Sequence, residues 1–177
     1  FGAFVTFIAI WSVVVYAPLA HWAWSPGGWL HKIGLLDFAG GTVVEISSGA
    51  SALALTLVLG PRRAWPREMM APHNLPLALL GAGLLWFGWI GFNAGSALSA
   101  GYLAATAALA THLSGVGGMI GCLILEKRLT TRAPTPGAPA GAAAGQVSCT
   151  PAAGLISPFP SPPPCLAPGL TRWCPAP

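Results

Sequence analysis

DFAGGTVVEISSGASALALTLVLG, residues 37–60, is an apolar stretch about as long as the roughly 20 residues that a helix needs to cross a bilayer. Asp37 precedes the helical run and is suited to cap its N-terminus. Glu45 follows eight residues later, about 12 Å further along a helix that rises 1.5 Å per residue. A carboxyl group at that depth in hydrocarbon is costly and usually marks a functional site. The stretch therefore predicts a membrane span that carries a site.

The composition of the whole chain also indicates a membrane protein. Of its 177 residues, 8 are Lys or Arg and 4 are Asp or Glu, whereas 54% are hydrophobic. Soluble domains carry roughly a quarter charged residues, so this chain lacks the side chains to cover a water-facing surface. The chain begins with Phe1 inside an apolar run, without a charged leader segment, and we expect it to be the interior of a longer protein.

Charge and cysteine usage narrow the expected partners. The net charge of +4 comes from residues in short segments between apolar runs. These residues form no basic stripe, so no nucleic-acid partner is expected. The four Cys have no metal-binding spacing, and we expect neither a metal nor another cofactor. The lipid bilayer is the partner that the composition predicts.

Four apolar runs predict an all-α, polytopic membrane protein. Residues 1–132 are expected to hold four transmembrane helices, at about 1–24, 37–60, 74–97 and 103–125. Six of the 8 Lys and Arg lie in the loops 61–73 and 126–137, which are separated by two spans. The bias of positive charge toward cytoplasmic loops predicts that both loops lie in the cytoplasm. Two Gly-x-x-x-Gly patterns, at 91–95 and 117–121, predict close helix packing.

The C-terminal part departs from this pattern. Residues 133–157 are small and apolar, and we interpret them as a degraded fifth span because Pro134, Pro136 and Pro139 weaken a helix. Residues 158–177 contain eight Pro, which excludes a stable helix. They are interpreted as a Pro-rich tail that is either disordered or out of frame.

Two carboxylates have alternative interpretations. Glu45 could take and release a proton within the span, or it could be a buried group that hydrogen-bonds a neighbouring helix. Asp37 could cap its helix, or it could contact a cation directly. An intramembrane enzyme that uses either group as an acid would need a second catalytic carboxylate in a membrane motif. Since no HExxH, GxSxG or Walker pattern occurs either, we do not expect an enzyme.

Aromatic and hydroxyl side chains mark the expected external ends of the spans. Trp22 and Trp24 lie at the end of the first span and Trp29 lies shortly after it. Together they indicate either an aromatic belt at the membrane surface or cation–π contacts with a small cation. Phe92 and Ser96 are one helical turn apart near the end of the third span. They could form a gate and a hydroxyl acceptor, although helix packing also accounts for them.

Four segments carry a resemblance to a known family. They are YAPLAHWAW (16–24), LLDFAGGTVVEISSG (35–49), PHNLPLALLGAGLLWFGWIGFNAGSA (72–97) and PTPGAPAGAAAGQVSCTPAAGLISP (134–158), the last in degraded form. In this order they resemble the ammonium transporter family (Amt/Mep/Rh). The resemblance covers most of the chain, and the second segment is similar to the family's signature span.

The resemblance implies an ammonium-transporter-like helix bundle, here incomplete. The family forms homotrimers with one pore per subunit and about eleven spans built from inverted repeats, of which this chain would supply roughly spans four to eight. The implied function is transmembrane transport of ammonium or ammonia, in a plasma or inner membrane, with a regulatory protein as a possible cytoplasmic partner. The alternative is a non-transporting ammonium sensor or a broken paralogue with the same fold.

The family's functional positions carry over residue by residue. Trp24 and Ser96 would line the external ammonium site through cation–π and hydroxyl contacts, and Asp37 would stabilise that recruitment site. Phe92 would be one gate ring, and Trp89 would pack beside the pore. These roles are expectations that the resemblance implies.

Glu45 is the main departure from the family's usual pattern. The position it takes is usually His, one of a hydrogen-bonded pair in the pore, although a minority of members have an acidic residue there. A carboxylate would hold the proton or stabilise a cation, which would make transport more cation-like. The partner His, the other gate Phe and the first spans lie outside this chain, so we do not expect the chain to form a working pore alone.

Overall fold

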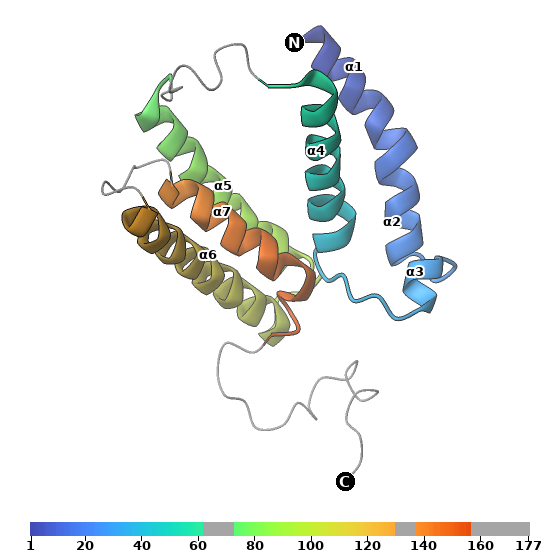
Figure 1. The fold of residues 1–177 in the computed structure, drawn as a ribbon. Helices are drawn as coiled ribbons and strands as arrows, with labels where there is room; N and C mark the ends of the chain where they lie inside the picture. Colours follow the sequence, from blue (N-terminus) through green and yellow to red (C-terminus); the bar gives the residue numbers. More distant parts are fainter. Residues whose placement is uncertain (62–72, 130–136, 157–177) are drawn as a thin grey trace.

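The structure, a computed structural model, describes residues 1–61, 73–129 and 137–156, and the regular elements in these ranges are all helical (Figure 1). The expected cytoplasmic loops lie mostly outside the described residues, and so does the Pro-rich tail at 158–177. The fold class predicted from composition, an all-α polytopic membrane protein, is confirmed.

The first span consists of α1 (Gly2–Trp11), a π-helical turn η1 (Ser12–Tyr16) and α2 (Ala17–Trp24), and a short α3 (Trp29–Lys32) follows it. The π-turn has a local cause. In a regular α-helix the ring of Pro18 would collide with the carbonyl of Val14, four residues earlier. The wider π-turn lies at this position and lets the span continue past the proline.

The second span begins with another π-helical turn, η2 (Gly41–Ile46), and continues as α4 (Ser47–Leu59). It lies alongside the first span in Figure 1. The indole of Trp11 donates a hydrogen bond of 2.7 Å to the Ser51 hydroxyl, which ties α1 to α4. This bond gives the pair a polar contact within a largely apolar interface.

The remaining helices form a second group. They are α5 (Leu75–Gly95), α6 (Tyr102–Leu129), α7 (Gly137–Cys149) and the short 3₁₀ turn η3 (Thr150–Ala152). The Asn74 side chain accepts a 2.9 Å bond from the Leu77 amide and so caps α5. The buried apolar cluster lies where α6, α7 and the residues after η3 meet, and Phe38 packs against it from the segment before η2.

The closest helix contact, between α6 and α7, uses different glycines from the two predicted patterns. A Cβ on Gly118 would lie 2.8 Å from the Gly145 Cα, and one on Gly141 would lie 2.6 Å from the Gly118 carbonyl oxygen. The glycines of both Gly-x-x-x-Gly patterns, at 91, 95, 117 and 121, instead have open space at their Cβ positions. The prediction that these patterns mark the close packing is therefore wrong within the described structure.

Four helices of the described residues are long and apolar enough to cross a membrane. They are Gly2–Lys32, Gly41–Leu59, Leu75–Gly95 and Tyr102–Arg128. Of residues 133–157, interpreted as a degraded fifth span, the structure describes 137–156, which include the 13 residues of α7. Pro139 is the third residue of α7, where its missing N–H breaks no intrahelical bond.

Candidate functional site

A cavity of about 430 Å³ lies between η2 and α5. Among the described residues that line it, the charged one is Glu45, from η2. The other lining residues are all on one face of α5: Gly81, Leu84, Leu85, Gly88, Trp89 and Phe92. The structure thus brings together the three residues that the family resemblance assigned to the pore or gate, namely Glu45, Trp89 and Phe92.

Glu45 contributes a partly exposed carboxylate to this wall. Within residues 1–61, 73–129 and 137–156 this carboxylate has neither a hydrogen-bond nor an ion-pair partner. The backbone carbonyl of Glu45 accepts a 3.0 Å bond from the Ser48 hydroxyl. The interpretation of Glu45 as a structural hydrogen-bonding group thus finds no partner among these residues. An unpaired carboxylate beside apolar walls is able to bind a proton or a small cation.

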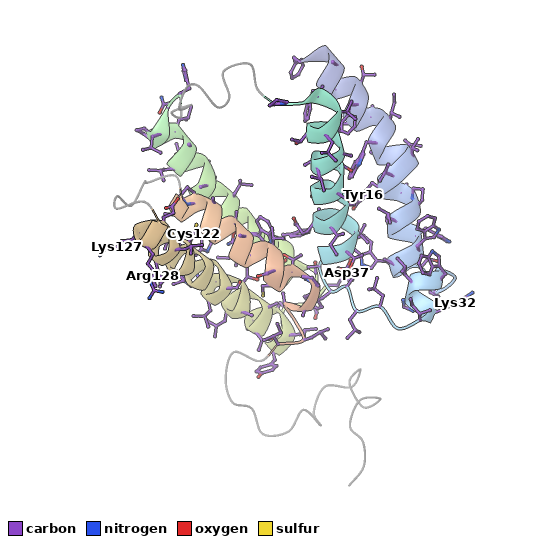
Figure 2. All side chains as sticks on the ribbon, in the orientation of Figure 1. Tyr16, Lys32, Asp37, Cys122, Lys127 and Arg128 are labelled. Carbon is purple, nitrogen blue, oxygen red and sulfur yellow. The ribbon has the colours of Figure 1, made fainter. Side chains whose placement is uncertain are left out.

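Asp37 fixes the start of the helix that carries Glu45. One carboxylate oxygen accepts a 2.8 Å bond from the Gly40 amide, and the other accepts bonds of 3.0 and 3.1 Å from the Thr42 and Val43 amides. These amides belong to the first turn, where the helix itself supplies no acceptor. Asp37 is therefore a helix cap in this structure, and it lies at the base of α4 in Figure 2.

Gly40 makes this capped turn possible. Its φ of +105° lies in the left-handed region, which a side chain disfavours. A Cβ here would also lie 2.8 Å from Val44 Cγ2 and 3.5 Å from the tip of the Phe92 ring. The absent side chain leaves room for the Phe92 ring, so the cap, the turn and the gate candidate adjoin one another.

The two residues expected at an external ammonium site lie at the same end of the helices. Trp24 ends α2, and its indole donates a 3.1 Å bond to the Asp37 backbone carbonyl. Ser96 follows α5, and its hydroxyl donates a 2.9 Å bond to the Phe92 carbonyl. Trp24 is thus bonded to Asp37, and Ser96 is bonded to Phe92. Their binding of a substrate stays a prediction.

Trp89 has a partner that the sequence did not reveal. Its indole Nε1–H donates a 2.9 Å bond to the hydroxyl of Thr150, at the start of η3. Thr150 is fully buried and also donates a 2.8 Å bond to the Gln146 carbonyl. The sequence indicated only the apolar spacing of this region. Nothing in the pattern indicates that Trp89 bonds a Thr that lies 61 residues further along the chain.

Asn93 lies one turn after Trp89 and faces α6. It is fully buried, and its amide donates a 2.8 Å bond to the Thr111 hydroxyl. Asn93 therefore joins α5 to α6. The same rotation of α5 leaves Trp89 and Phe92 on the cavity side.

Comparison with known proteins identifies the chain. Residues 1–162 match the family model described as Ammonium Transporter Family. The chain is 51% identical to a putative ammonium transporter of Methanothermobacter thermautotrophicus over 88% of its length, and 46% identical to the ammonium transporter of Bacillus subtilis over 91%. It spans only 37% and 39% of the lengths of these two curated relatives.

Solved structures share the same helix arrangement. Saccharomyces cerevisiae Mep2 superimposes with a TM-score of 0.78 at 37% identity, over 84% of this chain and 34% of that one. A structure described as a sensor Amt protein superimposes with a TM-score of 0.83 at 31% identity, over 89% of this chain and 42% of that one. The family consists of transporters rather than enzymes, which removes the intramembrane-enzyme reading. The chain belongs to the ammonium transporter family.

Proposed function

We propose that this chain forms one wall of an ammonium path, in a transporter whose other spans lie outside the chain. The observation that supports it most is the cavity in which the Glu45 carboxylate faces Trp89 and Phe92. One carboxylate among aromatic and small apolar side chains suits a small monovalent cation better than a large or anionic solute.

The chemistry of such a path follows from the cost of desolvation. An ammonium ion that enters hydrocarbon loses its hydration shell, which is costly unless protein groups replace it. Aromatic faces attract a cation through the ring quadrupole, and Trp89 and Phe92 offer two such faces. Glu45 would accept the proton, so that neutral ammonia crosses the apolar part, or it would balance the charge of the intact ion.

The external end would select the ion before it reaches the cavity. Trp24 would supply a cation–π face and Ser96 a hydroxyl oxygen, since both lie near the capped turn. Asp37 would act at one remove: its carboxylate is occupied by three amides, so it orients the turn and contributes negative potential. Phe92 would separate this end from the Glu45 cavity.

Replacing Glu45 by Gln in the complete protein tests this function. Gln keeps the size of the side chain but can neither ionise nor accept a proton, so pH-dependent uptake of labelled methylammonium should be abolished or lose its pH dependence. Cells that lack their own ammonium transporters provide the assay. Ser48→Ala is the matched control on the next turn, since it removes only the bond to the Glu45 carbonyl.

Two outcomes separate the possibilities. Uptake by Glu45→Gln that equals wild type at every pH would remove the proton role of this residue. Absence of uptake by the wild-type protein, with normal membrane insertion and ammonium binding, would favour a sensor, the second candidate, which the likeness to a sensor Amt protein supports. Absence of both binding and uptake would indicate a broken paralogue.

The assembly and orientation are further parts of this proposal. We expect a homotrimer, with the loops 61–73 and 126–137 in the cytoplasm and available to a regulatory protein. Lys127 and Arg128 lie at the end of α6 remote from Asp37 (Figure 2), as this orientation requires. Native mass spectrometry tests the subunit number, and labelling of a Cys placed at Lys127 with an impermeant reagent tests the sidedness.

A further inference from the structure

We propose that Thr150 and Pro151 are positioning residues, which hold the two walls of the Glu45 cavity at a fixed separation. The inference rests on the proposed function, because it assigns these residues a role in the geometry of the ammonium path. Both belong to η3, the short turn after α7, and neither lines the cavity. Each contacts a different wall.

Thr150 holds the α5 wall. Its hydroxyl accepts the 2.9 Å bond from the Trp89 indole and donates the 2.8 Å bond to the Gln146 carbonyl. Because the hydroxyl proton is used in the bond to α7, a lone pair of the oxygen points toward the indole. Because the indole is planar and joined to α5 by two rotatable bonds, one bond at its nitrogen fixes the face that Trp89 presents to the cavity.

Pro151 holds the wall that carries Glu45. Its carbonyl accepts a 2.9 Å bond from the Phe38 amide, next to the Asp37 cap. Its ring lies directly against Gly41, the first residue of η2, where a Cβ would come within 2.5 Å of the ring Cδ. The start of η2 therefore cannot approach η3 more closely, and the hydrogen bond from the Phe38 amide keeps it from moving away.

The turn itself is anchored in the core. Thr150 and Ala153 are fully buried, and Cys149, Ala153 and two alanines of α6 form the apolar cluster. The Phe38 ring packs against Gly154, which leaves no room for a side chain there. Two consecutive residues of this turn thus contact both cavity walls, so a displacement of the turn changes the distance between Trp89 and Glu45.

The test removes the Thr150 hydroxyl with little change of shape, in the complete protein. Thr150→Val deletes both hydrogen bonds, Thr150→Ser keeps them, and Thr106→Val is the matched control. Thr106 is also nearly buried, and its hydroxyl bonds the Leu103 carbonyl of its own helix. The first measurement is NMR of protein with ¹⁵N-labelled indoles, in which the Trp89 signal is assigned by Trp89→Phe.

The expected result has two parts. The Trp89 indole proton should shift upfield in Thr150→Val and return to its place in Thr150→Ser. Methylammonium uptake should fall in Thr150→Val by on the order of tenfold, since small misplacements near a site cost that much or more. Thr150→Ser and Thr106→Val should both transport at close to the wild-type rate, at equal amounts of folded protein.

Other results would overturn the proposal. An unchanged indole signal in Thr150→Val would show that Thr150 does not hold Trp89, and this readout requires no transport. A shifted signal with unchanged uptake would show that the position of Trp89 has no influence on the path. Equal loss of uptake in the Ser and Val variants would assign the effect to the fold and not to the hydroxyl. If the wild-type protein does not transport, the proposed function fails, whereas the NMR result still decides whether Thr150 positions Trp89.

Discussion

Gly118→Ala should separate α6 from α7 and destabilise the helix group that holds the cavity. The added Cβ would lie 2.8 Å from the Gly145 Cα and 2.9 Å from the Gly145 amide nitrogen, and still closer to the Gly141 carbonyl oxygen. Ordinary van der Waals contact begins at 3.4 Å, so the helices must part by at least 0.6 Å. All three atoms are backbone atoms, so no side-chain rotation can relieve the overlap.

The cost can be set against a control on the same helix. Overpacking of this kind costs about 1–3 kcal/mol, which corresponds to a fall in Tm of roughly 2–12 °C for a chain of this size. Gly117, the preceding residue, has open space at its Cβ position. Gly117→Ala should therefore leave the free energy of unfolding unchanged or raise it by at most about 1 kcal/mol, which is the difference in helix propensity between Gly and Ala.

Thermal unfolding of the two purified variants in detergent, followed by circular dichroism, measures the difference. The opposite signs are the decisive feature, because propensity alone would stabilise both variants. A Gly118→Ala protein as stable as Gly117→Ala would refute the contact between α6 and α7 as described. Such a result would mean that the two helices part by the required 0.6 Å at no cost, which close-packed backbones do not allow.

Two further variants examine the turn that carries Glu45. Asp37→Ala should lower the free energy of unfolding by about 1–2 kcal/mol through loss of the cap. Asp37→Asn should have an intermediate effect, because the amide replaces one of the two acceptor oxygens with a donor. Equal Tm values for wild type and Asp37→Ala would contradict the capping role. Gly40→Ala should lower the free energy of unfolding by about 1–2 kcal/mol, because the residue has a left-handed φ that a Cβ disfavours, and should reduce methylammonium uptake by moving Phe92. Gly49→Ala, in open space on α4, should leave uptake unchanged and should not lower the stability.

Much of the fold was predictable because the hydrocarbon core of a bilayer allows few backbone structures. Apolar runs of sufficient length have to be helices in a membrane, since each backbone polar group needs an internal partner. The spans expected near 74–97 and 103–125 correspond in place to α5 and α6, although α6 continues to Leu129. Lys127 and Arg128 lie in this extension, and long basic side chains of this kind can extend toward a membrane surface while the backbone continues as a helix.

The π-turns were not predictable in the same way. Neither Ser12–Tyr16 nor Gly41–Ile46 differs in hydrophobic pattern from an ordinary helical turn. One of them follows from a proline two residues beyond its end, and the other from a left-handed glycine and a carboxylate cap. Such turns depend on hydrogen bonds between specific atoms, which periodicity does not record.

The choice of glycines at the close helix contact shows the same limit. A Gly-x-x-x-Gly pattern states that two small residues share a helix face, but it does not state which face meets a neighbour. On α6 the facing residue is Gly118, one position away from the pattern that begins at Gly117. A shift of one residue rotates the contact by about 100°, so the pattern alone could not distinguish the packed face from the open one.

The segment after the last full span has the largest change of interpretation. Its prolines suggested a degraded helix, yet Pro139 lies in the first turn of α7 and Pro151 lies in η3, two places where a missing N–H costs nothing. α7 ends at Cys149, and the first two residues of η3 contact Trp89 and Gly41. This turn contacts both walls around Glu45, because the Thr150 hydroxyl accepts the bond from the Trp89 indole and the Pro151 ring lies against Gly41.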